Sequence, residues 1–113
     1  MAKENPALQG DYFSEPINDT YYTAYIVFAD YDTGEIKGRW GKGQYLGHSM
    51  AASGYSRESG TTSHITLDFV FEKCALVATD YTYSRLSGTI TEVNTGNVKD
   101  IVFNKSKNNF TNG

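Results

Sequence analysis

Aromatic side chains are the residues of this sequence best suited to bind a ligand. The chain holds nine Tyr, six Phe and one Trp among 113 residues, while Leu is scarce. Tyr and Trp combine an apolar body with a polar tip, which suits ligand pockets and protein interfaces. The alternative role for each of them is core packing in place of Leu. The candidate ligand-binding residues, in predicted strands or in one long loop, are Tyr25, Trp40, Tyr45, His48, Tyr55, Tyr81 and Tyr83.

The sequence offers little for metal or nucleophilic chemistry. The two histidines, His48 and His64, have no carboxylate or third ligand at metal spacing, and Cys74 is the only cysteine. Ser49 follows His48, but no Gly-x-Ser-x-Gly elbow is present to expose a nucleophilic serine. We therefore expect no catalytic residue, no metal site and no cofactor.

Three glycines surround Trp40 in the run Lys-Gly-Arg-Trp-Gly-Lys-Gly-Gln, whose composition is superficially that of a phosphate-binding loop. Gly43 is not followed by Lys-Ser or Lys-Thr, and no predicted helix follows the run. Glycines within a strand more often mark a bulge or a tight bend at a barrel corner. We interpret Gly38, Gly41 and Gly43 in that way, with the neighbouring charges in solvent.

Charge and hydropathy argue against two classes of partner. The net charge is −3 and both signs are interspersed, so the chain lacks the basic stripe that a phosphate backbone requires. No apolar run approaches the roughly 18 residues that span a bilayer, and the first six residues show no apolar leader segment. We expect a soluble domain that binds neither nucleic acid nor membranes.

Cysteine and asparagine give opposite indications of the compartment. A single Cys74 excludes an intramolecular disulfide and favours a reducing, cytoplasmic location. Three Asn-x-Ser/Thr matches, which begin at Asn18, Asn104 and Asn109, are typical of glycosylated exported proteins. Because the chain is rich in Asn and Thr, we attribute these matches to chance. We expect a cytoplasmic protein, with the mature form of an exported protein as the alternative.

Composition and turn signals predict one β domain. Val, Ile, Tyr, Phe, Trp and Thr make up 40 of the 113 residues, and these types fit a pleated, half-buried surface. The run 21–29 is β-branched and aromatic without a breaker, which makes it the most secure strand. Asp32-Thr33-Gly34 and Asn94-Thr95-Gly96 are each typical of a type I turn closed by a left-handed glycine. They predict hairpins that join 21–30 to 35–46 and 86–93 to 98–103.

A third hairpin is predicted between 63–71 and 75–83, and its register follows from where a carboxylate can lie. Apolar residues alternate with mostly polar ones along the first strand. A two-residue loop at Glu72-Lys73 would carry Asp80 onto the apolar face, at a cost on the order of several kcal/mol. We therefore expect a three-residue loop, Glu72 to Cys74, with Phe69 opposite Val77 and Asp80 on the outer face.

The remaining segments set the expected domain layout. Residues 47–62 are dominated by Ser, Gly and Thr, so we expect a long loop with at most one helical turn at 50–53. Residues 1–19 read as an irregular lead-in with at most one edge strand near Tyr12, and residues 105–113 as a polar tail. Residues 20–104 then form an all-β domain, a small antiparallel meander barrel of six to eight strands, with a sandwich as the second choice.

The leading hypothesis for function is a non-catalytic barrel that binds a small apolar or aromatic molecule in its mouth, beneath the 47–62 loop. It predicts an enclosed pocket of about 300 Å³ or more with few polar groups. The first alternative is a protein-binding or inhibitor module with an exposed Tyr-rich face, which would also allow a homodimer. The second is a small-barrel isomerase or hydratase, which would need a buried carboxylate, His or Tyr with a shifted pKa inside a cavity.

Overall fold

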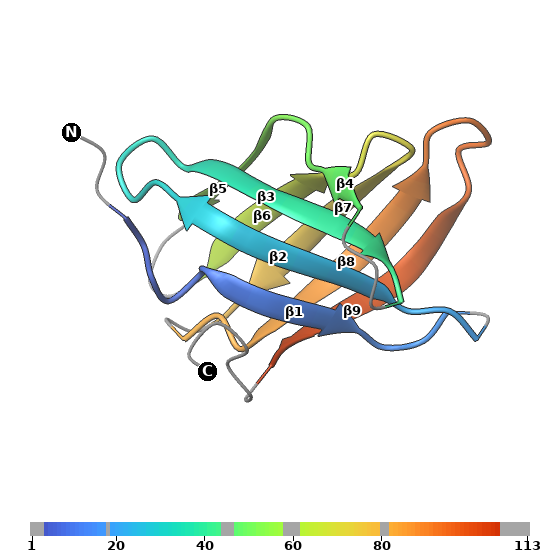
Figure 1. The fold of residues 1–113 in the computed structure, drawn as a ribbon, viewed down its shortest axis with the longest axis horizontal. Coiled ribbons are helices and arrows are strands. Elements are labelled where there is room, and N and C mark those ends of the chain that lie inside the picture. The colour runs from blue at the N-terminus through green and yellow to red at the C-terminus, as the bar shows by residue number, and fades with distance from the viewer. Residues whose placement is uncertain (1–3, 18, 44–46, 58–61, 80–81, 107–113) are drawn as a thin grey trace.

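The computed structural model of the chain describes residues 4–17, 19–43, 47–57, 62–79 and 82–106. Within them nine β-strands form one sheet that wraps around a common interior (Figure 1). Their bounds are β1 (Gly10–Ser14), β2 (Tyr22–Ala29), β3 (Glu35–Lys42), β4 (His48–Ser49), β5 (Ser53–Arg57), β6 (Ser63–Asp68), β7 (Glu72–Ala78), β8 (Arg85–Glu92) and β9 (Val98–Lys105). No helix capable of crossing a membrane occurs in this part of the chain.

Eight of the strands close into a barrel. Taken in chain order without β4, each strand pairs antiparallel with the next, and β1 pairs with β9 to complete the ring. β4 is an additional two-residue strand beside β3. The predicted all-β meander barrel is therefore confirmed over the sandwich. A barrel of eight strands has an interior just wide enough for side chains to fill or for one small ligand.

Both glycine-closed hairpins are confirmed. β2 pairs with β3 and β8 pairs with β9. The closing glycines have φ angles of 79° at Gly34 and 75° at Gly96, a region that glycine enters without a Cβ penalty. Local turn chemistry thus set these two connections.

Gly38 lies beside a bulge in the β2–β3 pair. The register of this pair shifts between Ile26 and Phe28, which leaves Val27 as the extra residue. A Cβ on Gly38 would lie 2.2 Å from the carbonyl oxygen of Tyr25, so the strands approach this closely only because residue 38 is glycine. Gly38 thus marks a bulge, as interpreted from the sequence, but the extra residue lies on the partner strand β2.

The register predicted for the third hairpin is wrong. β6 pairs with β7 so that Ile65 lies opposite Leu76 and Leu67 opposite Cys74. The turn is formed by residues 69–71, before the segment that was expected to form it. The inner and outer faces of β7 are therefore exchanged relative to the prediction.

Two features of residues 68–72 explain the earlier turn. The Asp68 carboxylate accepts a hydrogen bond from the backbone N–H of Val70 at 2.8 Å, which holds the chain in the turn. Glu72 then begins β7 on the inner face, with only 8% of its surface exposed. The prediction treated an inward carboxylate as prohibitive, but Glu72 occupies such a position next to a hydrogen-bond donor. Asp80 lies outside the described residues.

The predicted 47–62 loop with a helical turn is wrong for its described residues. His48–Ser49 form β4, and Ser53–Arg57 form β5, which pairs with β6 in the barrel wall. The polar Ser53 is buried because its hydroxyl accepts a hydrogen bond from the backbone N–H of Asp68 at 2.8 Å. Pairing with β6, 15 residues further along the chain at this hydrogen bond, gave small polar residues a place in a strand that their composition did not indicate.

A strand near Tyr12 was predicted correctly, but it is not an edge strand. β1 pairs with β2 on one side and with β9 on the other. Tyr12 is fully buried. The expected lead-in 1–19 therefore contains a barrel strand, and β9 continues to Lys105.

One cluster of buried apolar side chains fills the interior, with Tyr12, Phe69 and Phe103 among its largest fully buried members. The two ends of the barrel differ. At the closed end, where β1 begins and β2 ends in Figure 1, residues 4–9 lie next to the barrel and Leu8 is fully buried. At the open end, β2 and β7 begin while β3 and β8 end, and side chains of these strands surround the entrance.

Candidate functional site

Four of the predicted ligand-binding residues are divided between the two ends of the barrel. Trp40 and His48 lie together at the open end, where their stacked ring centroids are 4.7 Å apart. Tyr55 and Tyr83 lie at the closed end, where their rings meet edge to face at 6.4 Å. The structure therefore does not gather these four residues into one mouth.

The other three predicted residues do not join either pair. Tyr25 lies on β2 between the inward residues Ala24 and Ile26, so its side chain faces outward and is half-buried. Tyr45 and Tyr81 lie outside the described residues.

Tyrosines at the closed end have partners within the protein. The Tyr12 hydroxyl lies 2.9 Å from the carbonyl oxygens of both Leu8 and Tyr83. The Tyr83 hydroxyl is 3.0 Å from Ser63 Oγ. Asn5 donates a hydrogen bond to the Tyr55 hydroxyl at 3.1 Å. Protein groups thus satisfy the polar tips that a ligand would otherwise contact.

A buried aromatic cluster lies beneath the open end. Phe69 stacks on Trp40 with ring centroids 4.7 Å apart and an angle of 11° between the rings. Tyr22 stacks on Phe69 at 6.1 Å, and Phe103 meets Phe69 edge to face at 6.3 Å. These four residues come from β2, β3 and β9 and from the position directly after β6. The cluster therefore forms only when the barrel closes.

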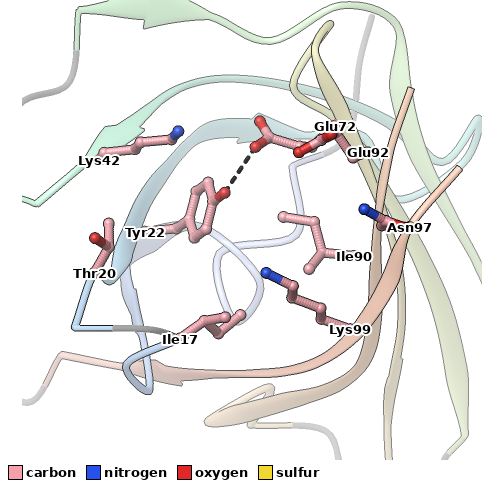
Figure 2. Close-up of a pocket in the computed structure, with 9 residues that line it drawn as sticks. All are labelled: Ile17, Thr20, Tyr22, Lys42, Glu72, Ile90, Glu92, Asn97 and Lys99. Carbon is pink, nitrogen blue, oxygen red and sulfur yellow. Dashed lines mark hydrogen bonds between the residues drawn. The ribbon is translucent and has the colours of Figure 1, made fainter. Parts of the chain in front are cut away.

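Glu72 and Tyr22 form the polar centre of the open end, and the sequence did not point to either residue. The Tyr22 hydroxyl donates a hydrogen bond of 2.7 Å to Glu72 Oε2 (Figure 2). Burial, and next the hydrogen bond to Glu72, raise the pKa of the Tyr22 phenol above its usual range. The phenol therefore remains a hydrogen-bond donor at neutral pH. The alternation of Glu72 with Cys74, Leu76 and Ala78 was the signal that could have placed Glu72 inward.

Two buried polar atoms at this end have no hydrogen-bond partner among the described residues. They are Oε1 of Glu72 and Nε1 of Trp40. Trp40 is only 3% exposed. Within the described part of the chain, neither Lys42 nor Lys99 forms an ion pair with Glu72 within 4.0 Å. A buried polar atom without a partner costs about 1–3 kcal/mol, so native proteins rarely retain one without a reason.

Two hollows flank Glu72 and share Glu72 and Lys42 as lining residues. The first hollow, about 240 Å³, is lined by Ile17, Thr20, Tyr22, Lys42, Glu72, Ile90, Glu92, Asn97 and Lys99 (Figure 2). The side hollow, about 310 Å³, is lined by Trp40, Lys42, His48, Phe71 and Glu72. Both open to solvent, whereas an enclosed pocket was predicted.

The side hollow exists because the sheet separates at this point. β4 pairs with β3, and its described residues make no ladder with β6 or β7. β5 also pairs with β3, but its register differs by one residue from that of β4. On its other side, β5 pairs with β6 as far as Thr66. Trp40, although only 3% exposed, lines this hollow with His48 of β4 and Phe71 of the 69–71 turn.

Exposed apolar side chains gather on two neighbouring turns at the open end. Val70 and Phe71 belong to the 69–71 turn, and Val93 and Val98 lie at the neighbouring β8–β9 turn. The backbone N–H of Val93 donates to the Phe71 carbonyl oxygen at 2.9 Å, which joins the two turns. We call these four residues the apolar rim. Val70 has a φ of 71°, an unfavourable conformation for a β-branched residue that is found most often at functional sites.

The polar groups buried at the open end are a carboxylate, a phenol and an indole N–H. Glu72 Oε1 can accept a hydrogen bond or a proton, and Trp40 Nε1 can donate a hydrogen bond. Tyr22 already donates to Glu72. The isomerase or hydratase alternative required a buried carboxylate or a Tyr with a shifted pKa, and this pair supplies both next to an open hollow. In the described residues no three His, Cys, Asp or Glu side chains are grouped to hold a metal ion.

Comparisons of the chain with protein-family models, curated proteins and solved structures found no match. The geometry of the open end is therefore the basis for the functional argument.

Proposed function

We propose that the protein is a non-catalytic binding barrel that takes a small molecule with an aromatic or apolar ring at its open end. The observation that carries this proposal is the side hollow, about 310 Å³, beside Trp40, His48 and Phe71. Small-molecule sites begin at about 300 Å³ and are walled mainly by apolar and aromatic side chains. A hollow at this lower limit fits a molecule of one or two rings.

The contrast between the ends supports the open end as the binding site. Phe71 is 58% exposed at the edge of the side hollow, and an exposed aromatic side chain next to a hollow can pack against a ring. The neighbouring Val70 is held in a strained conformation. At the closed end, in contrast, residues 4–9 occupy the position that a ligand would take.

Fluorescence and NMR of the single tryptophan test the proposal directly. Trp40 is the only Trp in the chain and lines the side hollow, so the tryptophan emission and the indole N–H resonance come from this one residue. We expect a panel of one- and two-ring aromatic compounds to include members that change both signals saturably. If no member of the panel produces a saturable change in either signal, the proposal is wrong.

A pair of matched variants locates the binding. Phe71→Ser and Val27→Ser each replace a half-exposed apolar residue, 58% and 49% exposed, but only Phe71 lines the side hollow. We expect Phe71→Ser to weaken binding of the panel compounds by about threefold or more, since it removes one wall. Val27→Ser should leave binding unchanged. Equal affinities of the two variants would place the site elsewhere.

A protein-binding module is the second candidate, and the apolar rim favours it. The exposed apolar side chains Val70, Phe71, Val93 and Val98 gather at one end, whereas Tyr31 is the only tyrosine among the large exposed apolar residues of the described chain. The expected Tyr-rich face is thus replaced by a Val- and Phe-rich rim. Light scattering over a range of concentrations measures whether two copies of the chain associate. If they do so through the apolar rim, Val93→Ser should lower the fraction of dimer.

A further inference from the structure

β4 is the one strand with a single neighbour in the described part of the sheet. It pairs with β3, so that Arg39 lies opposite Ser49 and Trp40 opposite His48, and its described residues form no other ladder. Each of the eight strands of the ring has a partner on both sides. A strand edge without a partner can pair with an extended segment of another chain.

The backbone of Ser49 presents one donor and one acceptor at this edge. The N–H of Met50 donates to the carbonyl oxygen of Gly38 at 2.9 Å, and hydrogen-bonded pairs alternate along an antiparallel ladder. The N–H and C=O groups of Ser49, the residue before Met50, therefore point away from β3. Within the described residues no hydrogen bond joins either group to a partner.

The turn between β6 and β7 explains why no described strand of the barrel covers Ser49. Ala51, two residues further on, donates its N–H to the carbonyl oxygen of Asp68 at 2.9 Å and so faces β6. β6 ends at Asp68, because the chain turns there toward β7. The space between β4 and the turn is thus bridged at Ala51. At its other end, His48 and Phe71 both line the side hollow.

Side chains of an added strand would alternate between the outer surface and the side hollow. His48 lines the hollow and Met50 packs against the core, whereas Ser49 is exposed between them. The residue opposite Ser49 in an antiparallel pair would share its outer face, and the two residues beside it would face inward. The added segment should therefore carry apolar residues on both sides of its central residue.

The charges on the outer face favour an acidic central residue. The guanidinium of the exposed Arg39 lies 3.5 Å from the Ser49 hydroxyl, and the exposed Lys73 lies beyond the turn on β7. Asp68 also lies here, and its carboxylate accepts a hydrogen bond from the Val70 N–H. Two cations against one carboxylate contrast with the net charge of −3 for the whole chain, so this surface attracts an acidic partner.

We propose that the β4 edge binds an extended segment of another protein by strand addition, with an acidic residue opposite Ser49 and an apolar residue on each side of it. The Ser49 N–H donates to the carbonyl oxygen of the acidic residue, and the Ser49 carbonyl oxygen accepts from its N–H. One apolar neighbour enters the side hollow between Trp40 and Phe71. This inference goes beyond the proposed function, because it assigns a partner to the sheet edge and needs no small-molecule ligand.

A set of synthetic peptides tests strand addition on the unmodified protein. Each is a short capped peptide with a central Glu between two apolar residues drawn from Leu, Ile, Val and Phe. We expect members of the set to bind saturably and to move the backbone amide proton of Ser49 downfield. N-methylation of the central Glu removes its donor and should weaken binding by about tenfold or more. N-methylation of the following residue, whose N–H points away from β4, is the matched control and should change the affinity by about twofold or less.

Two variants of Ser49 test the same contact from the side of the protein. Ser49→Pro removes the outward N–H, and an edge strand tolerates proline where the N–H faces solvent. We expect Ser49→Pro to weaken peptide binding by about tenfold or more. The control Ser49→Ala keeps the N–H and should bind as the unmodified protein does. Replacement of the central Glu of the peptide by Lys should weaken binding by about threefold or more at low salt, and by less at high salt.

The outcomes separate this inference from the proposed function. Equal affinity of the two N-methylated peptides overturns strand addition, as does the absence of saturable binding from the whole peptide set, whatever the ring compounds do. Failure of the ring compounds alongside peptide binding that depends on the Ser49 N–H overturns the proposed function alone. Dimerisation that Ser49→Pro abolishes would assign the edge to a second copy of the chain and overturn the peptide partner. Because the first comparison uses the unmodified chain, the test does not depend on folding of the Ser49→Pro protein.

Discussion

The two ends of the barrel are built from the same kinds of residue but leave their polar groups in opposite conditions. At the closed end, the hydroxyls of Tyr12, Tyr55 and Tyr83 all have partners inside the protein. At the open end, the Tyr22 hydroxyl has a partner, but Glu72 Oε1 and Trp40 Nε1 have none among the described residues.

The difference separates an end whose buried polar groups are paired from an end where two of them are not. Paired buried polar groups and a fully buried Leu8 make the closed end a stabilising plug. Unpartnered buried atoms and the strained Val70 lower stability, and proteins concentrate such features where they bind or react. Aromatic content alone does not distinguish the ends, whereas the satisfaction of polar atoms does.

The sharpest test of this contrast compares apolar truncations at the two ends. Leu8→Ala should lower the free energy of unfolding by about 2–5 kcal/mol, because it leaves a cavity beneath the plug. Phe71→Ala, on the exposed rim, should change it by about 0.5 kcal/mol or less. Urea unfolding followed by far-UV circular dichroism measures both. Equal losses would show that the closed end is not the stabilising one.

Polar substitutions should change stability with opposite signs at the two ends. Tyr12→Phe removes the single O–H donor that the carbonyl oxygens of Leu8 and Tyr83 share, so we expect a loss of about 1–2 kcal/mol. Glu72→Gln replaces a buried, incompletely paired carboxylate by an amide, so we expect a gain of about 1 kcal/mol. Urea unfolding at pH 7 measures both changes. A loss for Glu72→Gln would mean that the carboxylate is fully compensated within the folded chain.

Acid stability provides the mildest test and concerns Asp30, at the β2–β3 turn of the closed end. Hydrogen bonds donated by the backbone N–H groups of Thr33 and Asp32 hold the pKa of Asp30 below its usual range. Its stabilising contribution is therefore complete above about pH 4 and is lost as the pH falls through the lower folded value. Asp30→Asn keeps an acceptor without titrating. The stability difference between the two proteins should shrink below pH 4, and a constant difference would contradict this role.

Local signals predicted the parts of the fold that depend on neighbours in sequence. The turns Asp32-Thr33-Gly34 and Asn94-Thr95-Gly96 placed two hairpins correctly, because a left-handed glycine is a local requirement. The register of β6 with β7 could not be obtained in this way. It depends on Asp68, which holds the earlier turn, and on a donor from β2, which makes an inward Glu72 tolerable.

The candidate site was predictable only in part for the same reason. Trp40 and His48 were singled out and do lie together, because β4, which holds His48, pairs with β3 at Trp40. Tyr55 and Tyr83 were singled out by residue type alone, and the structure gives them partners at the other end. Glu72 was assigned to a loop, so its pairing with Tyr22, 50 residues earlier in the chain, could not be foreseen.

By itself the sequence determined the class of the fold, because β-branched and aromatic composition and glycine-closed turns act over a few residues. It also singled out Trp40 and His48, which lie together at the open end. Only the tertiary structure decided which of them satisfy one another and which remain unpartnered beside a hollow. That outcome depends on barrel closure, which brings β2, β3 and β7 together and fixes which buried polar atoms find a partner.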